Sequence, residues 1–335
     1  VLGVMLMVLL EALDTTVVNV ALPHMKGSFA ATSDQITWMI TAYLVSTAIV
    51  MPLTGYLVKK FGQREVLNFG VLGFIFASFA CGLSTSLEEM VVFRFLQGGL
   101  GAVVVPISQS IMFRAFPEEK RSQAMSFWGI ALMVGPLVGP VTGGWITENW
   151  SWPWIFFINI PLGLIALLLI SGKLEPNVDK KNVSTDWFGL IMLSVTLGAL
   201  QMVLDQGHTR DWFDSAFIWF LCWLTATGFA LFILHALQTR ESIVDIRLFG
   251  DKNFLVGNLL MAGYGMAMYS TIVLLPLQVQ EVLGYPPDTA GWILTPRGAV
   301  SAVLMIVVGT YLAPRVDGRL LMVSGLILSF FSSCL

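Results

Sequence analysis

The sequence predicts an all-α membrane protein, a polytopic bundle of spanning helices. Hydrophobic residues make up 56% of the 335 positions and charged residues only 12%, with a mean hydropathy of +0.80. A soluble domain carries about 25% charged residues. Apolar runs long enough to cross a bilayer, which takes about 20 residues, recur along the sequence. They lack the alternating pattern of a membrane β-barrel, so the predicted spans are helices.

The apolar runs predict ten spans and the start of an eleventh. The ten runs are 1–22, 36–58, 66–86, 90–113, 123–146, 154–171, 187–204, 216–236, 254–280 and 290–313, and the eleventh begins near 320. The first run has no basic segment before it and no small-residue cleavage site after it, so it is not a signal peptide. Because the sequence opens inside one run and stops inside another, we expect a fragment that lacks further C-terminal helices.

The basic residues fall mainly in one set of alternate loops. Of the 18 Lys and Arg residues, fourteen lie in this set, two (Lys26 and Arg210) in the opposite loops, and two within predicted helices. Cytoplasmic loops are enriched in Lys and Arg. The sequence therefore predicts a multi-pass membrane protein with a cytoplasmic N-terminus. Trp150, Trp152 and Trp154 then fall at an outer helix boundary, where aromatic residues are enriched.

A weak internal repeat predicts how the spans are grouped. Gly55–Arg64 follows the second span and Gly309–Arg319 follows the tenth, and each segment is a glycine followed by a basic turn. Transporters built from repeated halves show such symmetry. We expect an N-terminal six-helix bundle over 1–171, a cytoplasmic linker with two extra spans over 172–253, and the start of a truncated C-terminal bundle over 254–335.

Several functional classes find no support in the sequence. A net charge of -3 and a pI near 5.6 leave no basic face for nucleic acid. Cys81, Cys222 and Cys334 are far apart and form neither a disulfide framework nor a metal-ligand pattern. The sequence contains no phosphate-binding glycine loop and no nucleophile elbow. We therefore expect no enzyme, no ATP-driven pump, no cofactor and no metal.

Two carboxylates, Glu11 and Asp14, lie deep within a predicted span. Asp14 is nine residues before Pro23. At about 1.5 Å per residue this depth places it near the midplane of the bilayer. A charge there costs at least about 2.5–3.5 kcal/mol, which favours a functional role in coupling to protons. The alternative is a structural hydrogen bond to a neighbouring helix.

Two arginines, Arg94 and Arg297, are predicted to lie at similar depth in the fourth and tenth spans. Arg94 is a candidate partner for the Asp14 carboxylate. Its alternative is a side chain that extends to the outer interface. Arg297 follows Pro296 and either binds an anionic group of a substrate or braces the helix at the proline.

The fifth span carries a glycine and proline pattern. Gly135, Gly139 and Gly143 recur every four residues, which makes one helix face smooth enough for another backbone to approach closely. Pro136 and Pro140 remove backbone donors within the same stretch. Ordinary membrane packing also uses such glycines, so the alternative is a contact without a role in transport.

Five motifs resemble those of one transporter family. Leu13–Pro23 is similar to a first-helix motif, and Gly55–Arg64 to the loop signature between helices two and three. Arg94–Gly101 resembles the fourth-helix motif, whose arginine is implicated in proton coupling. Gly139–Gly144 resembles the antiporter motif, and Trp152–Pro161 a sixth-helix signature. By these motifs the chain resembles the major facilitator superfamily, and within it the fourteen-helix drug/proton antiporters of the EmrB/QacA type.

The resemblance implies proton-driven export of amphipathic drugs or toxic compounds by alternating access. It implies a fold with an extra helix pair between two halves. It also implies a location in the plasma (inner) membrane. The partners it implies are small amphipathic substrates, protons, a periplasmic adaptor and an outer-membrane channel. Site residues fall in three groups. Those for proton coupling are Asp14, Glu11 and Arg94; those of conformational motifs are Gly55, Lys60, Gly62, Arg64, Gly135, Gly139, Pro140, Gly143 and Gly144; those of the substrate cavity are Thr16, Asn19, Gln97, Asn159 and Arg297.

The sequence departs from the family pattern at two positions and leaves other functions open. Lys59 stands where the loop signature has an aspartate, and Glu11 where relatives often have an amide. An exporter of one endogenous metabolite or lipid would share these features. A substrate/cation symporter would share the fold but lack the glycine and proline pattern of the fifth span. A scaffold or receptor would have no need of carboxylates at the midplane.

Overall fold

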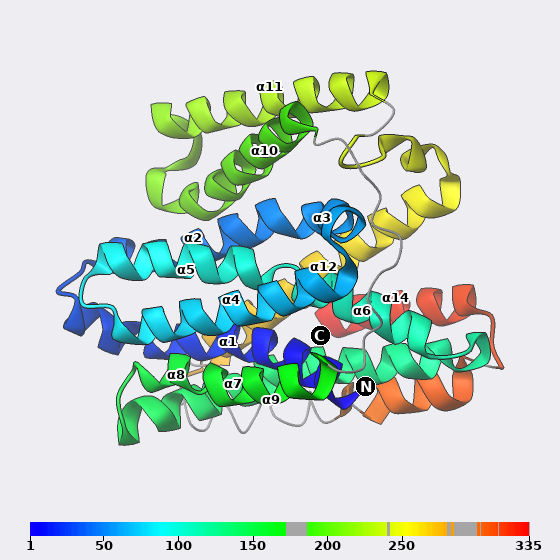
Figure 1. The fold of residues 1–335 in the computed structure, drawn as a ribbon, viewed down its shortest axis with the longest axis horizontal. Helices are drawn as coiled ribbons and strands as arrows, with labels where there is room; N and C mark the ends of the chain where they lie inside the picture. The colour runs from blue at the N-terminus through cyan, green and yellow to red at the C-terminus, as the bar shows by residue number, and fades with distance from the viewer. Residues whose placement is uncertain are drawn as a thin grey trace.

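The computed structural model describes residues 1–171, 186–239, 242–279, 283–284, 300–301, 303–313 and 315–334, almost all of them in helices (Figure 1). Seven helices among these residues, some made of two consecutive pieces, are long and apolar enough to cross a membrane. The all-α membrane architecture predicted from composition is therefore present.

The first six predicted spans all appear as helices. They are α1 (Leu2–Ser28), α2 (Ser33–Val50) with η1 (Met51–Leu53) and α3 (Thr54–Phe61), α4 (Gln63–Leu83), α5 (Leu87–Gly101) with α6 (Val104–Ala115), α7 (Arg121–Asn149), and α8 (Trp154–Phe157) with α9 (Asn159–Ser171). A short turn, η2 (Glu118–Lys120), precedes α7. The fourth span is thus two helices rather than the single one predicted, because the backbone turns at residues 102–103.

The later spans are also helical where they are described. They comprise α10 (Trp187–Gln206), the turns η3 (His208–Arg210) and η4 (Trp212–Asp214), α11 (Ala216–Gln238), η5 (Ile246–Gly250), α12 (Lys252–Leu277), η7 (Val308–Leu312) and α14 (Gly318–Cys334). The N-terminal part of the tenth predicted span, including Arg297, lies outside the described residues.

The first helix runs beyond its predicted end. The predicted span stops before Pro23, whereas α1 continues through it to Ser28. Proline in a helix interior removes one backbone hydrogen bond, which a long, well-packed helix can tolerate. Because α1 extends to Ser28, Asp14 lies next to the midpoint of this 27-residue helix.

The two sets of loops lie at opposite ends of the bundle. In Figure 1 the loops after α1, α4 and α10 lie at the left end, and the basic loops after α3 and α6 lie at the right end. At the C-terminal end of α1, Trp152 donates its indole N–H to Ser28 Oγ (2.9 Å) and packs on Phe29, with ring centroids 5.3 Å apart. Aromatic residues and basic loops therefore mark opposite ends, as the spans predict.

The helices α10 and α11 form a pair beside α2 (Figure 1). Thr41 of α2 donates a hydrogen bond to Asp205 of α10, and at the other end of α10 Asp186 caps the helix and contacts His235 of α11 at 2.7 Å. The helix pair α10 and α11 therefore packs on α2 through α10. The division of the chain into three units remains a prediction.

Two large apolar clusters make up most of the core of the first nine helices. One contains Met7, Val71 and Val104 with their neighbours, and the other contains Val17, Met90 and Phe156 with theirs. Between the two clusters, four helices contribute five buried polar side chains: Asp14 of α1, Ser78 of α4, Arg94 and Gln97 of α5, and Asn159 of α9. Polar groups buried this deeply must satisfy one another, which makes this layer the candidate site.

Candidate functional site

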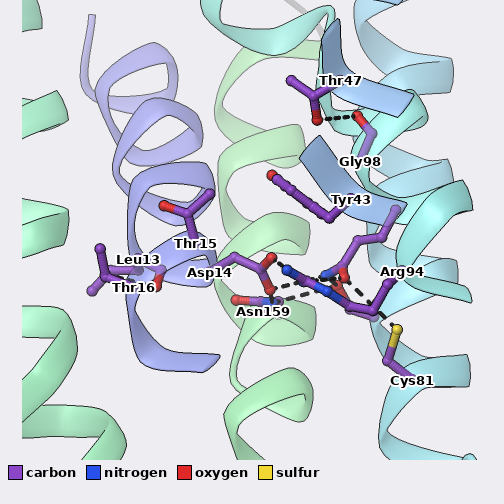
Figure 2. A network of polar contacts seen from close by, with 12 residues as sticks. Leu13, Asp14, Thr15, Thr16, Tyr43, Thr47, Cys81, Arg94, Gly98 and Asn159 are labelled. Carbon is purple, nitrogen blue, oxygen red and sulfur yellow. Dashed lines mark hydrogen bonds and ion pairs between the residues drawn. The ribbon is translucent and has the colours of Figure 1, made fainter. Parts of the chain in front are cut away.

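Asp14 is the centre of the buried polar layer (Figure 2). Its carboxylate Oδ2 lies 2.7 Å from Arg94 Nη1, which makes a buried ion pair. Its Oδ1 accepts hydrogen bonds from Gln97 Nε2 (2.9 Å) and Asn159 Nδ2 (2.7 Å). The pairing of Arg94 with Asp14 expected from their depth is observed, and Arg94 does not extend toward an interface.

Most of the remaining polar atoms of the layer also find partners, whereas the buried Arg94 Nε has none among the described residues. Arg94 Nη1 donates a second hydrogen bond to Gln97 Oε1 (2.7 Å), and Gln97 Nε2 donates one to Ser78 Oγ (2.7 Å). Cys81 Sγ lies 3.7 Å from Gln97 Oε1. A hydrogen-bonded network of this kind can help to keep a charge pair stable away from water. Any change in the charge of Asp14 must therefore rearrange several partners at once.

The Arg94 guanidinium rests on an aromatic ring. Its Cζ lies 4.2 Å from the centre of the Tyr43 ring of α2, in a cation–π contact (Figure 2). Gly98 makes this possible, because a Cβ at that position would overlap the Tyr43 carbonyl oxygen and the Ser46 hydroxyl. Thr47 Oγ1 also donates to the Gly98 carbonyl (3.2 Å). The glycine of the fourth-helix motif thus lets α2 approach the arginine of the same motif.

Glu11 lies outside this layer although it is one turn from Asp14. Its side chain is buried and lines a small cavity with Met7, Leu10, Val71, Phe74, Gly101 and Val104. Its Oε2 has no hydrogen-bond partner among the described residues. The two carboxylates expected to act as a pair thus face different surroundings.

The glycine stripe of α7 packs on the segment of α1 that carries Asp14. A Cβ at Gly135 would overlap Ala12, one at Gly139 would overlap the Thr16 side chain, and one at Gly143 would come within 2.9 Å of the Val17 carbonyl oxygen. Thr16 Oγ1 also donates to the Gly135 carbonyl (3.3 Å). At Gly144 an added Cβ would meet only Val20 Cγ1, at 3.7 Å. The stripe is a contact surface for α1.

The stretch with two prolines remains helical. Pro136 and Pro140 lie within α7, which runs without interruption from Arg121 to Asn149. The structure therefore shows the close helix contact expected from the glycines, whereas the prolines do not divide the helix into two.

The loop signature places a glycine where the backbone requires one. Gly62 separates α3 from α4 and has φ +99°, a conformation that residues with a Cβ rarely adopt. Lys60 Nζ donates to Tyr56 Oη (3.2 Å) on the same helix. Gly55 has open space around its missing Cβ among the described residues. In the repeated segment, by contrast, Gly309 packs against Ser126 of α7.

Only two of the five predicted substrate-cavity residues are brought together among the described residues. Gln97 and Asn159 belong to the Asp14 layer, and Thr16 lies between α1 and α7. Asn19 is exposed, and Arg297 lies outside the described residues. Their role in binding a substrate stays a prediction.

Three residues of the site were missed by the sequence reasoning: Tyr43, Ser78 and Cys81. A serine and a cysteine three residues apart on one apolar helix face the same neighbour, and that spacing is a signal that could have marked Ser78 and Cys81. Tyr43 has no comparable signal, because its place under Arg94 depends on how α2 packs against α5.

A buried ion pair at the midpoint of the first of many spanning helices defines a multi-pass membrane protein with a charged interior site. Residues 4–335 match the Major Facilitator Superfamily, and the chain belongs to that family.

Curated relatives are similar over nearly the whole chain. It is 38% identical over 328 residues to the fatty acid resistance protein FarB of Neisseria gonorrhoeae, 98% of this chain and 64% of that protein. It is 37% identical to the multidrug export protein EmrB of Haemophilus influenzae (93% of this chain, 61% of that protein) and 36% identical to EmrB of Escherichia coli (92% and 60%). The chain therefore spans less than two thirds of the length of these relatives.

Solved structures share the fold. The proton:xylose symporter XylE, bound to 6-bromo-6-deoxy-D-glucose, superposes with a TM-score of 0.63 at 16% identity, over 92% of this chain and 68% of that one. The human organic anion transporter MFSD10 gives a TM-score of 0.58 at 18% identity, over 94% and 72%. At these identities the likeness concerns the fold alone.

Proposed function

We propose that the full-length protein is a proton-driven exporter of amphipathic toxic compounds that works by alternating access. The buried pair of Asp14 and Arg94 carries this proposal. A carboxylate at the midpoint of a spanning helix is expensive, and its retention favours a role in moving charge. Because Asp14 has partners from three other residues, gaining or losing a proton there changes how α1, α5 and α9 hold together.

The conformational step follows from the same contacts. Protonation of Asp14 would remove the negative charge opposite Arg94 and weaken three hydrogen bonds at once. The stripe of α7 packs directly on this part of α1, so a shift of α1 would pass to α7. We infer that the first six spans rock against the later half, with α10 and α11 as an extra pair. The membrane potential supplies about 2.3 kcal/mol per charge per 100 mV for this step.

The substrate class rests on the named relatives. EmrB is called a multidrug export protein and FarB a fatty acid resistance protein, and both names fit amphipathic cargo. A second candidate is export of one lipid-like compound, which the likeness to FarB favours. Comparing efflux of a cationic dye with efflux of a fatty acid separates the two, since transport of only the fatty acid would replace the broader proposal.

The direct test is dye efflux in inverted membrane vesicles that contain the full-length protein. An imposed pH gradient should drive dye accumulation, and a protonophore that collapses the gradient should stop it. Accumulation that continues after the collapse would contradict proton coupling, and dependence on ATP would replace it with another energy source.

The proposed location is the plasma membrane, with the N-terminus in the cytoplasm. Single cysteines at Lys120, in a basic loop, and His208, in the opposite loop, test the orientation. An impermeant thiol reagent applied to intact cells should label the cysteine at 208 and not that at 120, in a background without the native cysteines. The reverse pattern would invert the orientation.

A periplasmic adaptor and an outer-membrane channel are proposed partners. Crosslinking in intact cells should capture an adaptor on the periplasmic loops. Efflux into the medium that continues unchanged when adaptor genes are deleted would remove this part of the proposal.

A further inference from the structure

Glu11 is a buried carboxyl group with no visible role in the Asp14 layer. The side chain is 7% exposed, and Oε2 has no hydrogen-bond partner among the described residues. It is in contact with a cavity that has space for about one water molecule. The rest of the cavity wall is apolar: Met7, Leu10, Val71, Phe74, Gly101 and Val104.

The surroundings of Glu11 favour a neutral carboxyl group. A buried charge needs an opposite charge or several hydrogen bonds, and the cavity offers neither. Asp14 has both, because Arg94, Gln97 and Asn159 all donate to it. Two anions one turn apart would also repel each other, and Arg94, the cation of the adjacent layer, is bonded to Asp14.

The ionisable groups on the helices around Glu11 are few. Asp14 on α1 and Arg94 on α5 lie in the adjacent layer, and Tyr43 on α2 lies against Arg94. The other charged residues of the packed helices belong to terminal turns, away from the cavity: Arg64 and Glu65 of α4, Glu88 and Glu89 of α5, Arg114 of α6, and Arg121 and Glu148 of α7. Among the described residues, Asp14 is therefore the group that sets the local charge at Glu11.

We propose that Glu11 is a proton-binding site of its own, which holds a proton in this conformation and releases it to water when the helices around the cavity separate. Binding converts the carboxylate and one proton from water into a neutral acid, and release reverses it. Among the described residues no hydrogen bond joins Glu11 to Asp14, so the two sites exchange protons with water separately. The inference rests on the proposed function: each export cycle would then move one proton more than Asp14 alone carries.

Infrared difference spectroscopy on the purified full-length protein tests the protonation directly. The carbonyl stretch of a neutral carboxylic acid should be present at neutral pH, disappear reversibly at alkaline pH, and be absent in Glu11→Gln. Glu11→Asp should retain a band at a shifted position, and Glu148→Gln, at the end of α7, should leave the original band unchanged. Absence of the band in the unmodified protein would overturn the proposal, as would a band that persists at every pH at which the protein stays folded.

The number of protons exchanged per substrate tests the second half of the proposal, that Glu11 releases its proton during the export cycle. In proteoliposomes, the membrane potential that balances a fixed substrate gradient gives the number of protons exchanged per substrate. Glu11→Gln should lower this number by one while transport continues, and Glu11→Asp should restore it. An unchanged number in Glu11→Gln would make Glu11 a fixed neutral acid and overturn the proposal. If the unmodified protein exchanges no protons, the proposed function fails, whereas the infrared titration still decides the state of Glu11.

Discussion

Asp14 and Glu11 lie one turn apart on α1, yet one is in a polar layer and the other in an apolar cavity. Asp14 accepts three hydrogen bonds and faces a guanidinium at 2.7 Å. Glu11 faces hydrocarbon and a water-sized space. The difference comes from the helices opposite: α5 and α9 present Arg94, Gln97 and Asn159 to Asp14, whereas α4 and α6 present Val71, Phe74 and Val104 to Glu11.

The comparison shows that depth in the membrane does not define a role by itself. Two carboxylates at nearly the same depth can carry different charge, because the partners decide which form is stable. Asp14 has a cation and two amide donors around it, whereas we propose that Glu11 is a neutral acid that exchanges its proton with water. Each prediction below alters one of these surroundings and leaves the other in place.

Removing the charge of Asp14 should have the largest effect. Asp14→Asn leaves Arg94 as a buried cation without its partner, which costs about 3–5 kcal/mol. We expect pH-driven efflux to fall to the level of vesicles without the protein, together with lower accumulation of the variant. Dye efflux and membrane content are measured in the same vesicles.

The double variant Asp14→Asn/Arg94→Gln is the matched control, since it leaves no unpaired charge. It should recover the accumulation of the protein but not the efflux. Recovery of coupled efflux by the double variant would show that the pair is structural and that protons are carried elsewhere.

Arg94→Lys should have the next largest effect, confined to the polar layer. Lysine keeps the charge but loses the planar guanidinium that bonds Asp14 and Gln97 and stacks on Tyr43. Loss of one charge-assisted hydrogen bond, at about 1.5–3 kcal/mol, would reduce efflux roughly tenfold or more. The Glu11 infrared band should stay in place. Efflux at the original rate would make Arg94 a general cation rather than a positioned one.

Gly139→Ala should act on α1 from the other side. The added methyl group overlaps the Thr16 side chain, and overpacking of this kind costs about 1–3 kcal/mol. We expect slower efflux, because α1 can no longer sit at its distance from α7. Gly144→Ala on the same helix has room, with its nearest neighbour at 3.7 Å, and should behave as the unmodified protein. Equal rates for the two variants would reduce the stripe to ordinary packing.

Most of the architecture could be predicted from the sequence, because spanning helices need long apolar runs and these runs are visible. Helix ends were harder. Pro23 suggested an end that the structure places at Ser28. The single span predicted over 90–113 overlooked Pro106, which has no N–H to donate to the Ala102 carbonyl at the break of 102–103. Within a membrane a helix tends to continue past a proline, because backbone groups left without a hydrogen bond find no water there.

The site was predictable in part for a related reason. Asp14 and Arg94 are conspicuous as charges within apolar runs, so their pairing could be anticipated from depth. Nothing in the sequence sets Tyr43 or Ser78, taken alone, apart from other residues of apolar helices, and their roles follow from which helices pack together. The separation of Glu11 from Asp14 also depends on packing, because a spacing of three residues places both near one face of α1 and does not say which helix each one meets.

The measurement closest to the central claim is substrate-driven proton movement in proteoliposomes that contain the full-length protein and start with no pH gradient. Adding a substrate on one side should move protons in the opposite direction, detected by a pH-sensitive dye inside the vesicles. We expect this flux in the unmodified protein, a smaller one in Glu11→Gln, and none in Asp14→Asn/Arg94→Gln. Proton movement of the original size in that double variant would contradict the assignment of Asp14 as the carrier.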